Sequence, residues 1–546
     1  MNFAAVVSVL CFVILTWFHI LKRLNSRRTG SASGKLPPGP RPFPIIGNFL
    51  HLGQKPHESL AELSKTYGPL MHLKLGTIDT IVVSSPEMAK EILHKHDQAC
   101  SGRAVPVSAQ TLDHHKMSIA WLPVGKKWRV LRKITKEQMF SISRLDSSQG
   151  LRQEKLRKLL DYVHECCLSR RVVDIGEAVF VTSLNLMSAT LFSVDFAGFD
   201  AGSAQEFKET ITGAAKSVAA PNIADYVPWL KIFDPQGIKR QSEFYFSKLF
   251  GIIESVVDQR LQARGTHFGA PVEKDLLEAL LDISQGSDYD FSCREIKHLL
   301  LVVPDDKTSC FNFQVPFIAS PFMAKIRVGK RDAMQELLTV SNVRTSLLGV
   351  RDDSGTVEWA MTELLRNPHV LSKAKNELRN IVGETKQVEE SDISSLPYLQ
   401  AVIKETLRCH PSARFLVPHK AETDVEIDGY MIPKDAQILV NVWAICKDSN
   451  VWPSPDSFEP ERFLDHQKDY KGRDFELIPF GSGRRMCPGM PLAHRIVHLM
   501  VASLIHNYDW EFERGMKPED VDISNKFELS LRKAVPLKAI PTRNEA

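Results

Sequence analysis

The chain has 546 residues, of which 43% are hydrophobic and 25% are charged, and its formal net charge at pH 7 is +4. A chain of this length and composition can bury a large core, and the length alone predicts several domains. The slight positive charge argues against a nucleic-acid-binding protein, which usually carries a strongly basic surface.

The nine cysteines are spread along the chain, and their number is odd. No pair has the spacing of zinc ligands, and a disulfide framework is not expected in so long a chain. We therefore expect free thiols in a reducing compartment. The nine are Cys11, Cys100, Cys166, Cys167, Cys293, Cys310, Cys409, Cys446 and Cys487.

The N-terminal segment over residues 3–21 is almost wholly apolar and is just long enough to span a bilayer. A basic cluster follows at once, made of Lys22, Arg23, Arg27 and Arg28. Positive charge after a span holds that end in the cytosol. A cleaved signal peptide is the alternative, but its basic n-region and small-residue cleavage site are missing. We predict an uncleaved, single-pass anchor in the endoplasmic reticulum membrane over residues 1–21, with the rest of the chain in the cytosol.

A basic and proline-rich hinge is predicted over residues 22–48. It contains a small-residue linker at 30–35 and a proline-rich run at 36–42. Proline fixes φ and resists helix formation, so this run should be stiff and extended.

Beyond the hinge, the pattern of apolar residues is mainly helical. Short β-like stretches lie at residues 70–75 and 80–83, and from Met88 onward apolar residues recur at three- and four-residue spacing. Residues 221–239 are rich in proline and aromatic residues and break this pattern. No internal repeat is visible.

The most informative passage lies at residues 480–489, which read F-x-x-G-x-R-x-C-x-G. Gly483 and Gly489 should let the backbone turn tightly and expose amide N–H groups near the sulfur of Cys487. Hydrogen bonds of this kind tune the potential of a bound metal. A buried structural cysteine in a glycine-rich turn is the alternative. The passage resembles the cysteine-ligand loop of the cytochromes P450.

This resemblance implies that the Cys487 thiolate binds a haem iron. Such a thiolate pushes electron density onto the metal, which favours O–O cleavage. The resemblance also implies that Arg485 meets a haem propionate, and that Phe480, Gly483 and Gly489 belong to the haem-binding loop.

A second motif, E-x-x-R, places Glu405 and Arg408 on one face of a predicted helix, where they can pair. Alone this is a weak signal, because an exposed helical ion pair is the usual explanation. The string P-E-R-F at 460–463 lies between this motif and the cysteine loop, as in the cytochromes P450. The resemblance implies a buried network in which Arg462 joins Glu405 and Arg408 and holds the proximal side of the haem.

Trp128 and Arg132 form a W-x-x-x-R pattern whose members point the same way on a helix. An ordinary amphipathic helix is the alternative. The resemblance implies that both donate to haem propionates, and that His419, in the string V-P-H, is another propionate contact. The surrounding basic residues are either a solvated face or a docking site for an acidic reductase. They are Lys126, Lys127, Arg129 and Lys133.

The resemblance spans nearly the whole chain, from the hinge to Pro541. It implies a mainly α fold with a small β portion, in which residues 49–546 form one catalytic domain. Strings at 225–229, 234–237 and 491–495 are similar to the plant subgroup that includes geraniol 8-hydroxylase and diterpenoid hydroxylases. The implied reaction inserts one oxygen atom from O2 into a hydrophobic small molecule, here a terpenoid. The implied cofactor is haem b (iron-protoporphyrin IX), with electrons from NADPH through the flavoprotein NADPH–cytochrome P450 reductase.

The oxygen-activating helix departs from the family pattern A/G-G-x-D/E-T-T, whose acid and alcohol deliver protons during oxygen activation. Residues 295–301 begin like this helix and residues 354–361 end like it. An anomalous segment at 302–353 lies between them, and it contains helix-breaking prolines. If Ser354 anchors the alignment, Arg351 stands in place of the acid and Asp352 in place of the threonine. The catalytic acid and alcohol are therefore unassigned.

Two explanations of this interruption remain open. A structureless insertion of about 40 residues is unusual in a compact core, so residues 302–347 look like retained intron sequence or a shifted reading frame. The other explanation is divergence to a haem-thiolate isomerase or dehydratase, similar to allene oxide synthases. We favour the first, because the ligand loop of such isomerases usually departs from the pattern and this one does not. A haem-binding but inactive homologue is a further alternative.

The resemblance also predicts the walls of the substrate pocket at 104–120, 412–417 and 525–529, and a loop over the substrate channel at 221–239. A pocket for a terpenoid should be largely apolar. Arg414 is unexpected there, and it either reaches a propionate or points away from the cavity.

Overall fold

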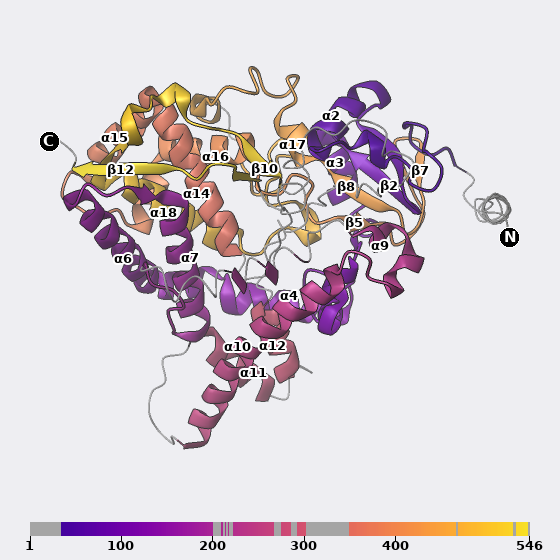
Figure 1. Ribbon diagram of the computed structural model, residues 1–546, viewed down its shortest axis with the longest axis horizontal. Helices are drawn as coiled ribbons and strands as arrows, with labels where there is room; N and C mark the ends of the chain where they lie inside the picture. Colours follow the sequence, from indigo (N-terminus) through magenta and orange to yellow (C-terminus); the bar gives the residue numbers. More distant parts are fainter. Residues whose placement is uncertain are drawn as a thin grey trace, which may run out of the picture.

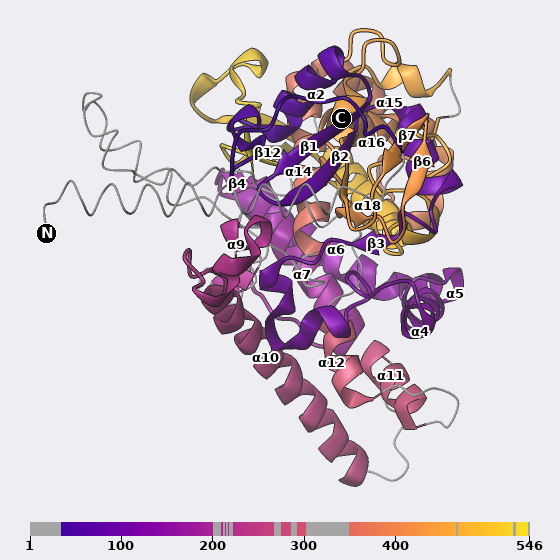
Figure 2. The same cartoon turned by 90° about the vertical axis from the view of Figure 1, so that its right-hand side faces the viewer.

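The computed structural model describes residues 34–199, 209–210, 213–214, 217, 222–266, 275–285, 292–301, 349–465, 468–527 and 531–543. The membrane anchor predicted over residues 1–21, the first part of the predicted hinge, and Cys11 and Cys310 lie outside these residues. In the described part the chain is mainly helical, with small sheets at its edges (Figures 1 and 2). The mainly α fold with a small β portion is confirmed.

The helices used below are α2 Pro56–Tyr67, α3 Pro86–Lys90, α4 Lys126–Ile134, α5 Ile142–Ser147, α6 Gln149–Leu168, α7 Ile175–Phe192, α9 Ile223–Tyr226, α10 Ile238–Thr266, α11 Leu276–Gln285, α12 Cys293–Leu301, α14 Gly349–Arg366, α15 Pro368–Val382, α16 Pro397–Cys409, α17 Val442–Cys446 and α18 Met490–Asn507. The strands are β1 Leu70–Leu75, β2 Ile78–Val83, β3 Gly102–Arg103, β4 Val173–Asp174, β5 His419–Lys420, β6 Val425–Ile427, β7 Tyr430–Ile432, β8 Gln437–Val440, β9 Tyr508–Phe512, β10 Asn525–Phe527, β11 Leu531–Lys533 and β12 Lys538–Arg543.

The largest sheet has five strands in the order β1-β2-β8-β5-β3. β1 and β2 form an antiparallel hairpin in which Leu70 pairs with Val83, and β8 runs parallel to β2. Both predicted β-like stretches are strands, although the second begins at Ile78 rather than Thr80. Figure 1 shows this sheet beside α2, α3 and α17, while most long helices lie on the other side of the molecule.

The proline-rich run is extended, as predicted, and it is fastened to the body. The main-chain N–H of His72 donates to the Pro38 carbonyl at 2.9 Å, and that of Met431 donates to the Lys35 carbonyl at 2.9 Å. Gly39 is required here, because a Cβ atom at this position would lie 1.8 Å from the His72 carbonyl oxygen. The run therefore fixes the direction in which the chain enters the body.

The helical core is built around α14, which packs against α7, α16 and α18 and lies inside the helical part in both views (Figures 1 and 2). Among the described residues, α7 is the one helix long and apolar enough to cross a membrane, but 89% of its span is buried inside the body. It is therefore a core helix, whose apolar residues on every side are covered by neighbouring helices.

The oxygen-activating helix is described as two separate pieces, α12 and α14. The anomalous segment between them lies outside the described residues up to residue 348, and its last residues form the first turn of α14. The predicted break in the helical pattern at 221–239 is confirmed over 222–237, where only α9 and a short 3₁₀ helix, Pro228–Ile232, occur before α10.

Candidate functional site

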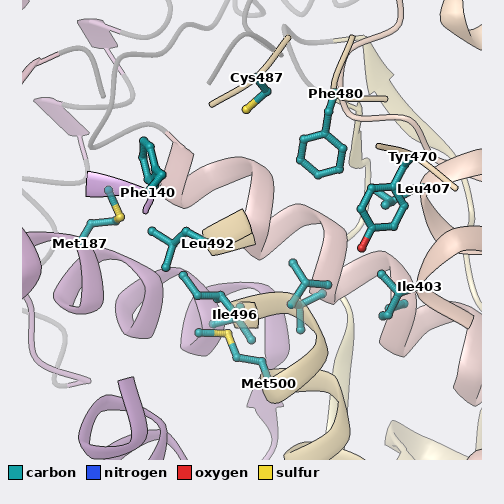
Figure 3. Close-up of a cluster of buried hydrophobic side chains, with 14 of the residues drawn as sticks. Phe140, Met187, Ile403, Leu407, Tyr470, Phe480, Cys487, Leu492, Ile496 and Met500 are labelled. Atoms are coloured by element: carbon teal, nitrogen blue, oxygen red, sulfur yellow. The ribbon is translucent and has the colours of Figure 1, made fainter. Parts of the chain in front are cut away.

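The cysteine loop ends directly before α18, and a hydrogen bond closes it. The Cys487 N–H donates to the Phe480 carbonyl at 3.0 Å, and the Cys487 side chain is only 5% exposed. Figure 3 shows Cys487 and Phe480 together with Leu492 and Phe140 in a cluster of buried side chains. The cysteine thus presents its sulfur to an interior, apolar space.

Two glycines of this loop, Gly481 and Gly483, have left-handed backbones, and only Gly483 is one of the two that the sequence singled out. Gly483 has φ +69°, and a Cβ there would lie 2.0 Å from the Leu93 carbonyl oxygen. Gly481 has φ +71° and was missed. Gly489 has φ −78°, which any residue adopts, so the prediction that it supports the tight turn was wrong. It caps α18 instead.

Arg485 is buried two residues before the cysteine, and main-chain carbonyl oxygens surround its guanidinium. Its guanidinium donates to the carbonyls of Ser101 at 3.0 Å, Ile119 at 3.3 Å and Leu122 at 2.5 Å. It also lies 4.9 Å from the centre of the Trp128 ring, which favours a cation–π contact. The Trp128 indole N–H donates to Ile119 as well, at 3.0 Å.

Arg132 lies on the same face of α4 as Trp128, as its spacing predicted. Its guanidinium is 5.9 Å from the Trp128 ring centre and donates to the carbonyl of Met486, the residue next to Cys487. The W-x-x-x-R motif therefore contacts the cysteine loop directly.

His419 lies at the edge of this cluster, in β5. Its Nδ1 is 2.8 Å from the Cys100 carbonyl oxygen, which only accepts, so Nδ1 carries the proton. Burial, followed by the guanidiniums of Arg103 and Arg485, holds the pKa of His419 well below its usual value. Sequence reasoning missed Arg103, which is buried and donates to the Val417 carbonyl at 2.8 Å. The sequence does not show burial, so its available signal was an arginine directly after a glycine in a short strand.

These residues fit a haem. The buried Cys487 thiol is a soft ligand suited to iron. Arg103, Arg132 and Arg485 gather positive charge beside it, which complements two carboxylates such as haem propionates. Trp128 adds a neutral N–H donor. No cluster of three or more His, Cys, Asp or Glu side chains that could hold a different metal is found in the part of the chain that the structure describes.

The Glu405–Arg408–Arg462 network forms as the sequence predicts. Arg408 Nε is 2.7 Å from Glu405 Oε2, and both side chains are fully buried. Arg462 Nε lies 3.1 Å from Glu405 Oε1 and is 9% exposed. Arg408 also donates to main-chain carbonyls of the segment before P-E-R-F, including Pro455 at 2.7 Å and Ser457 at 3.0 Å. The network ties α16 to the chain that leads into the cysteine loop.

At the start of α14, Arg351 and Asp352 lie in the first turn, and only their main chain is described. The following polar residues, Asp353 and Thr356, line a small cavity of about 10 Å³ together with His498 of α18. The Thr356 hydroxyl is 3.5 Å from that of Ser412. Asp353 and Thr356 thus face α16 and α18.

Two of the predicted pocket walls, 412–417 and 525–529, meet at Arg414. Its guanidinium donates to the Lys526 carbonyl of β10 at 3.2 Å and contributes to lowering the pKa of buried His57 in α2. The Leu531 N–H donates to the Ser412 carbonyl at 3.1 Å. The walls at 412–417 and 525–529 thus lie side by side, although residues 528–530 lie outside the described part.

The basic residues around Trp128 are exposed, and they cover the outer face of α4: Lys126, Lys127, Arg129 and Lys133. Lys127 pairs with Glu295 at 2.5 Å.

The seven cysteines in the described residues are all free thiols, as expected.

Comparison with known proteins identifies the family. The sequence model described as Cytochrome P450 matches residues 37–303 and 342–539, and leaves out residues 304–341. The chain therefore belongs to the cytochrome P450 family, whose members carry a haem iron, and it is an oxidoreductase.

Several plant proteins are similar to this chain over nearly its whole length. Cytochrome P450 76T24 from Catharanthus roseus is 48% identical over 98% of this chain and 99% of its own. Ferruginol synthase from Isodon rubescens is 47% identical over 100% of both chains. Carnosic acid synthase from Rosmarinus officinalis is 44% identical over 95% of both chains. The recognition made from the motifs is confirmed.

Proposed function

We propose that this chain is a membrane-bound haem-thiolate monooxygenase that hydroxylates a terpenoid. Haem b is its cofactor, O2 its oxidant, and NADPH its electron source through NADPH–cytochrome P450 reductase. The observation that carries the proposal is the buried Cys487 thiol beside a rim of cations and N–H donors. A thiolate-bound haem supplies the O–O cleavage that such a hydroxylation needs.

In this proposal each group of the site has one task. The Cys487 thiolate would bind the haem iron, and the Phe480 carbonyl and the left-handed backbone of Gly483 hold its loop. Trp128, Arg132, His419 and Arg485 hold the propionates, and we add Arg103 to them. Their present hydrogen bonds to carbonyls of the same loops place the donors at one edge of the site before a ligand arrives, which lowers the cost of ordering them.

A terpenoid substrate is supported by the relatives and by local strings of the sequence. Ferruginol and carnosic acid, which appear in the names of two similar proteins, are both diterpenoids. The relatives give no support to the isomerase or inactive alternatives. The local strings at 225–229 and 491–495 point to the same subgroup.

Location at the endoplasmic reticulum membrane is supported by an exposed apolar patch near the point where the described chain begins. Ile45 is 68% exposed, Trp229 66% and Ile232 86%. Phe49 packs edge-on against Tyr226 with ring centres 4.9 Å apart, so the two segments that carry the patch are neighbours. Apolar side chains of this kind dip into a bilayer surface, and an N-terminal anchor would hold them there.

The exposed basic face of α4 is the proposed docking site for the reductase. It lies on the helix whose inner face carries Trp128 and Arg132, so a bound flavoprotein would be close to the haem edge. Electrostatic steering toward such a face raises association rates and weakens with salt.

The proposal is tested by reconstituting the full chain with reductase and NADPH in lipid and screening a panel of mono- and diterpenoids. A thiolate-type spectrum of the reduced carbon-monoxide complex, and an NADPH-dependent product one oxygen atom heavier than its substrate, would support it. A conversion that proceeds equally without NADPH would support an isomerase instead.

A further inference from the structure

The 3₁₀ segment η3, Val107–Lys116, is hydrogen-bonded to α9 at its start and to α12 at its end. At its start, the Val107 N–H donates to the Asp225 carboxylate of α9 at 2.6 Å. At its end, His114 Nδ1 lies 3.1 Å from Nδ1 of His298 in α12. Between the ties, Leu112 and Asp113 have left-handed backbones with φ +52° and +59°. Two contacts therefore hold a segment whose middle is strained.

The contact between the two histidines, called the histidine bridge below, is enclosed by aromatic rings. His114 is 1% exposed and His298 4%. The Phe246 ring lies 5.4 Å from that of His114, and the Phe250 ring lies 4.6 Å from that of His298. In such surroundings a hydrogen bond is strengthened and a charge is disfavoured.

The surroundings also indicate which histidine donates. His114 Nε2 is buried and has no hydrogen-bond partner in the part of the chain that is described. A buried N–H without a partner is rarer than an unpaired acceptor, so Nε2 is bare and the proton of His114 is on Nδ1. His114 thus donates to the bare Nδ1 of His298. A second proton on His298 would occupy that nitrogen and break the bridge.

A short stretch of main chain connects the bridge to the cysteine site. The His114 carbonyl accepts the N–H of Met117 at 3.1 Å and that of Ser118 at 2.9 Å. The carbonyl of Ile119, the residue after Ser118, accepts from both Trp128 and Arg485. The place of His114 therefore constrains the carbonyl that orients the two donors.

We propose that His114 and His298 are positioning residues whose bridge closes the segment 107–119 over the site and holds Trp128 and Arg485 in place. The part of this inference that concerns the cofactor rests on the proposed haem site. The closure itself does not, because every contact in it is made by the chain alone.

The bridge should weaken in acid. Burial, then His298 and His115, holds the pKa of His114 well below its usual value of about 6.5. Because the pKa is lowered in the closed form, closure is fully stable above about pH 6.5 and loses stability as the pH falls below it. Release of His114 by opening favours the open form about tenfold per pH unit.

Other charged groups near the bridge set the net slope. Burial raises the pKa of Asp225 to about 7. Exposing Asp225 on opening would therefore free a proton, which opposes the proton uptake of His114. The remaining groups on the packed elements mostly pair with one another, as Lys116–Asp113, Lys127–Glu295 and Lys297–Glu254. Opening at the bridge end alone releases His114 and leaves the Val107–Asp225 contact in place, so we expect a slope of about tenfold per pH unit.

Hydrogen exchange of the purified holoprotein tests the inference, with rates corrected for the intrinsic effect of pH. In the wild type, exchange over residues 107–122 should rise roughly tenfold between pH 6.5 and 5.5. His298→Leu should exchange about fivefold faster at pH 8, because one hydrogen bond is lost. His298→Asn, whose amide can replace Nδ1 but does not titrate, should stay protected at pH 8 and show a smaller slope.

His115→Asn is the matched control, since it changes the neighbouring histidine and leaves the bridge intact. Equal exchange in His298→Leu and the wild type would overturn the inference, and so would equal exchange in His298→Leu and His298→Asn. The spectrum of the reduced carbon-monoxide complex, recorded on the same samples, separates this outcome from failure of the haem proposal. A missing thiolate spectrum in the wild type would overturn only the latter.

Discussion

The cysteine loop and the start of α14 should face each other across the same haem, yet they differ in how fully they match the family. In the cysteine loop, Cys487 and Arg485 both have defined contacts with neighbouring segments. At the start of α14, Arg351 and Asp352 stand where an acid and a threonine are expected, and the family match stops at 303 and resumes at 342. Binding a haem and using oxygen are separate demands, and this chain meets the first more clearly.

Replacing the ligand should break the cysteine side most severely. Cys487→Ser should abolish the thiolate-type spectrum of the reduced carbon-monoxide complex and all NADPH-dependent product, because a hydroxyl does not supply a thiolate. Cys167→Ser, a free cysteine of α6, is the control and should keep both. An unchanged thiolate spectrum in Cys487→Ser would refute the assignment.

Removing one charge from the buried network should be the next largest effect. Glu405→Gln strands the guanidiniums of Arg408 and Arg462 in the interior, and we expect a loss of about 3–5 kcal/mol in the free energy of unfolding. Glu461→Gln, in the P-E-R-F string, removes the charge from a 2.6 Å pair with half-exposed Lys373 and keeps an oxygen that can accept from the Tyr398 hydroxyl. It should cost less than about 1 kcal/mol. Similar urea midpoints for the two variants would mean that the network does not stabilise the part of the fold that carries the cysteine loop.

The two glycines of the F-x-x-G-x-R-x-C-x-G pattern should respond differently to replacement by alanine. Gly483→Ala forces a side chain into a left-handed backbone and against the Leu93 carbonyl, at a cost of about 1–3 kcal/mol. Gly489→Ala, at φ −78°, should cost little. Haem retention during urea titration measures both, and a larger effect at Gly489 would show that its role lies in contact with the cofactor.

Deleting residues 1–28 should leave the site untouched, which makes it the mildest change. Much of the protein should move from the microsomal to the soluble fraction, with an unchanged carbon-monoxide spectrum. The apolar patch around Ile45 and Ile232 should retain some of it at the membrane. Secretion of the full chain with a cleaved N-terminus would contradict the anchor.

Sequence reasoning located the residues that act through fixed local spacing. The i,i+4 pair Trp128 and Arg132 and the i,i+3 pair Glu405 and Arg408 are examples, because a helix dictates their relative direction. It missed Arg103 and the bridge between His114 and His298, which join segments far apart in the chain. It also misjudged Gly489, because a glycine in a motif does not reveal its φ. Such features depend on tertiary packing, which spacing does not encode.

Coupling of NADPH use to product is the most direct test of the contrast between the cysteine loop and α14. Purified chain is compared, with reductase and a terpenoid substrate, against a variant in which residues 302–353 are replaced by a short apolar helical turn ending in Ala-Gly-Thr-Asp-Thr-Thr. Misplaced proton donors cost about 100-fold in rate, and a guanidinium such as that of Arg351 does not release its proton near neutral pH. We therefore predict that the original chain binds haem and hydroxylates slowly, releasing most of its electrons as hydrogen peroxide, while the variant is tightly coupled. Equal, tight coupling in both would contradict this account and place the proton-delivering groups elsewhere.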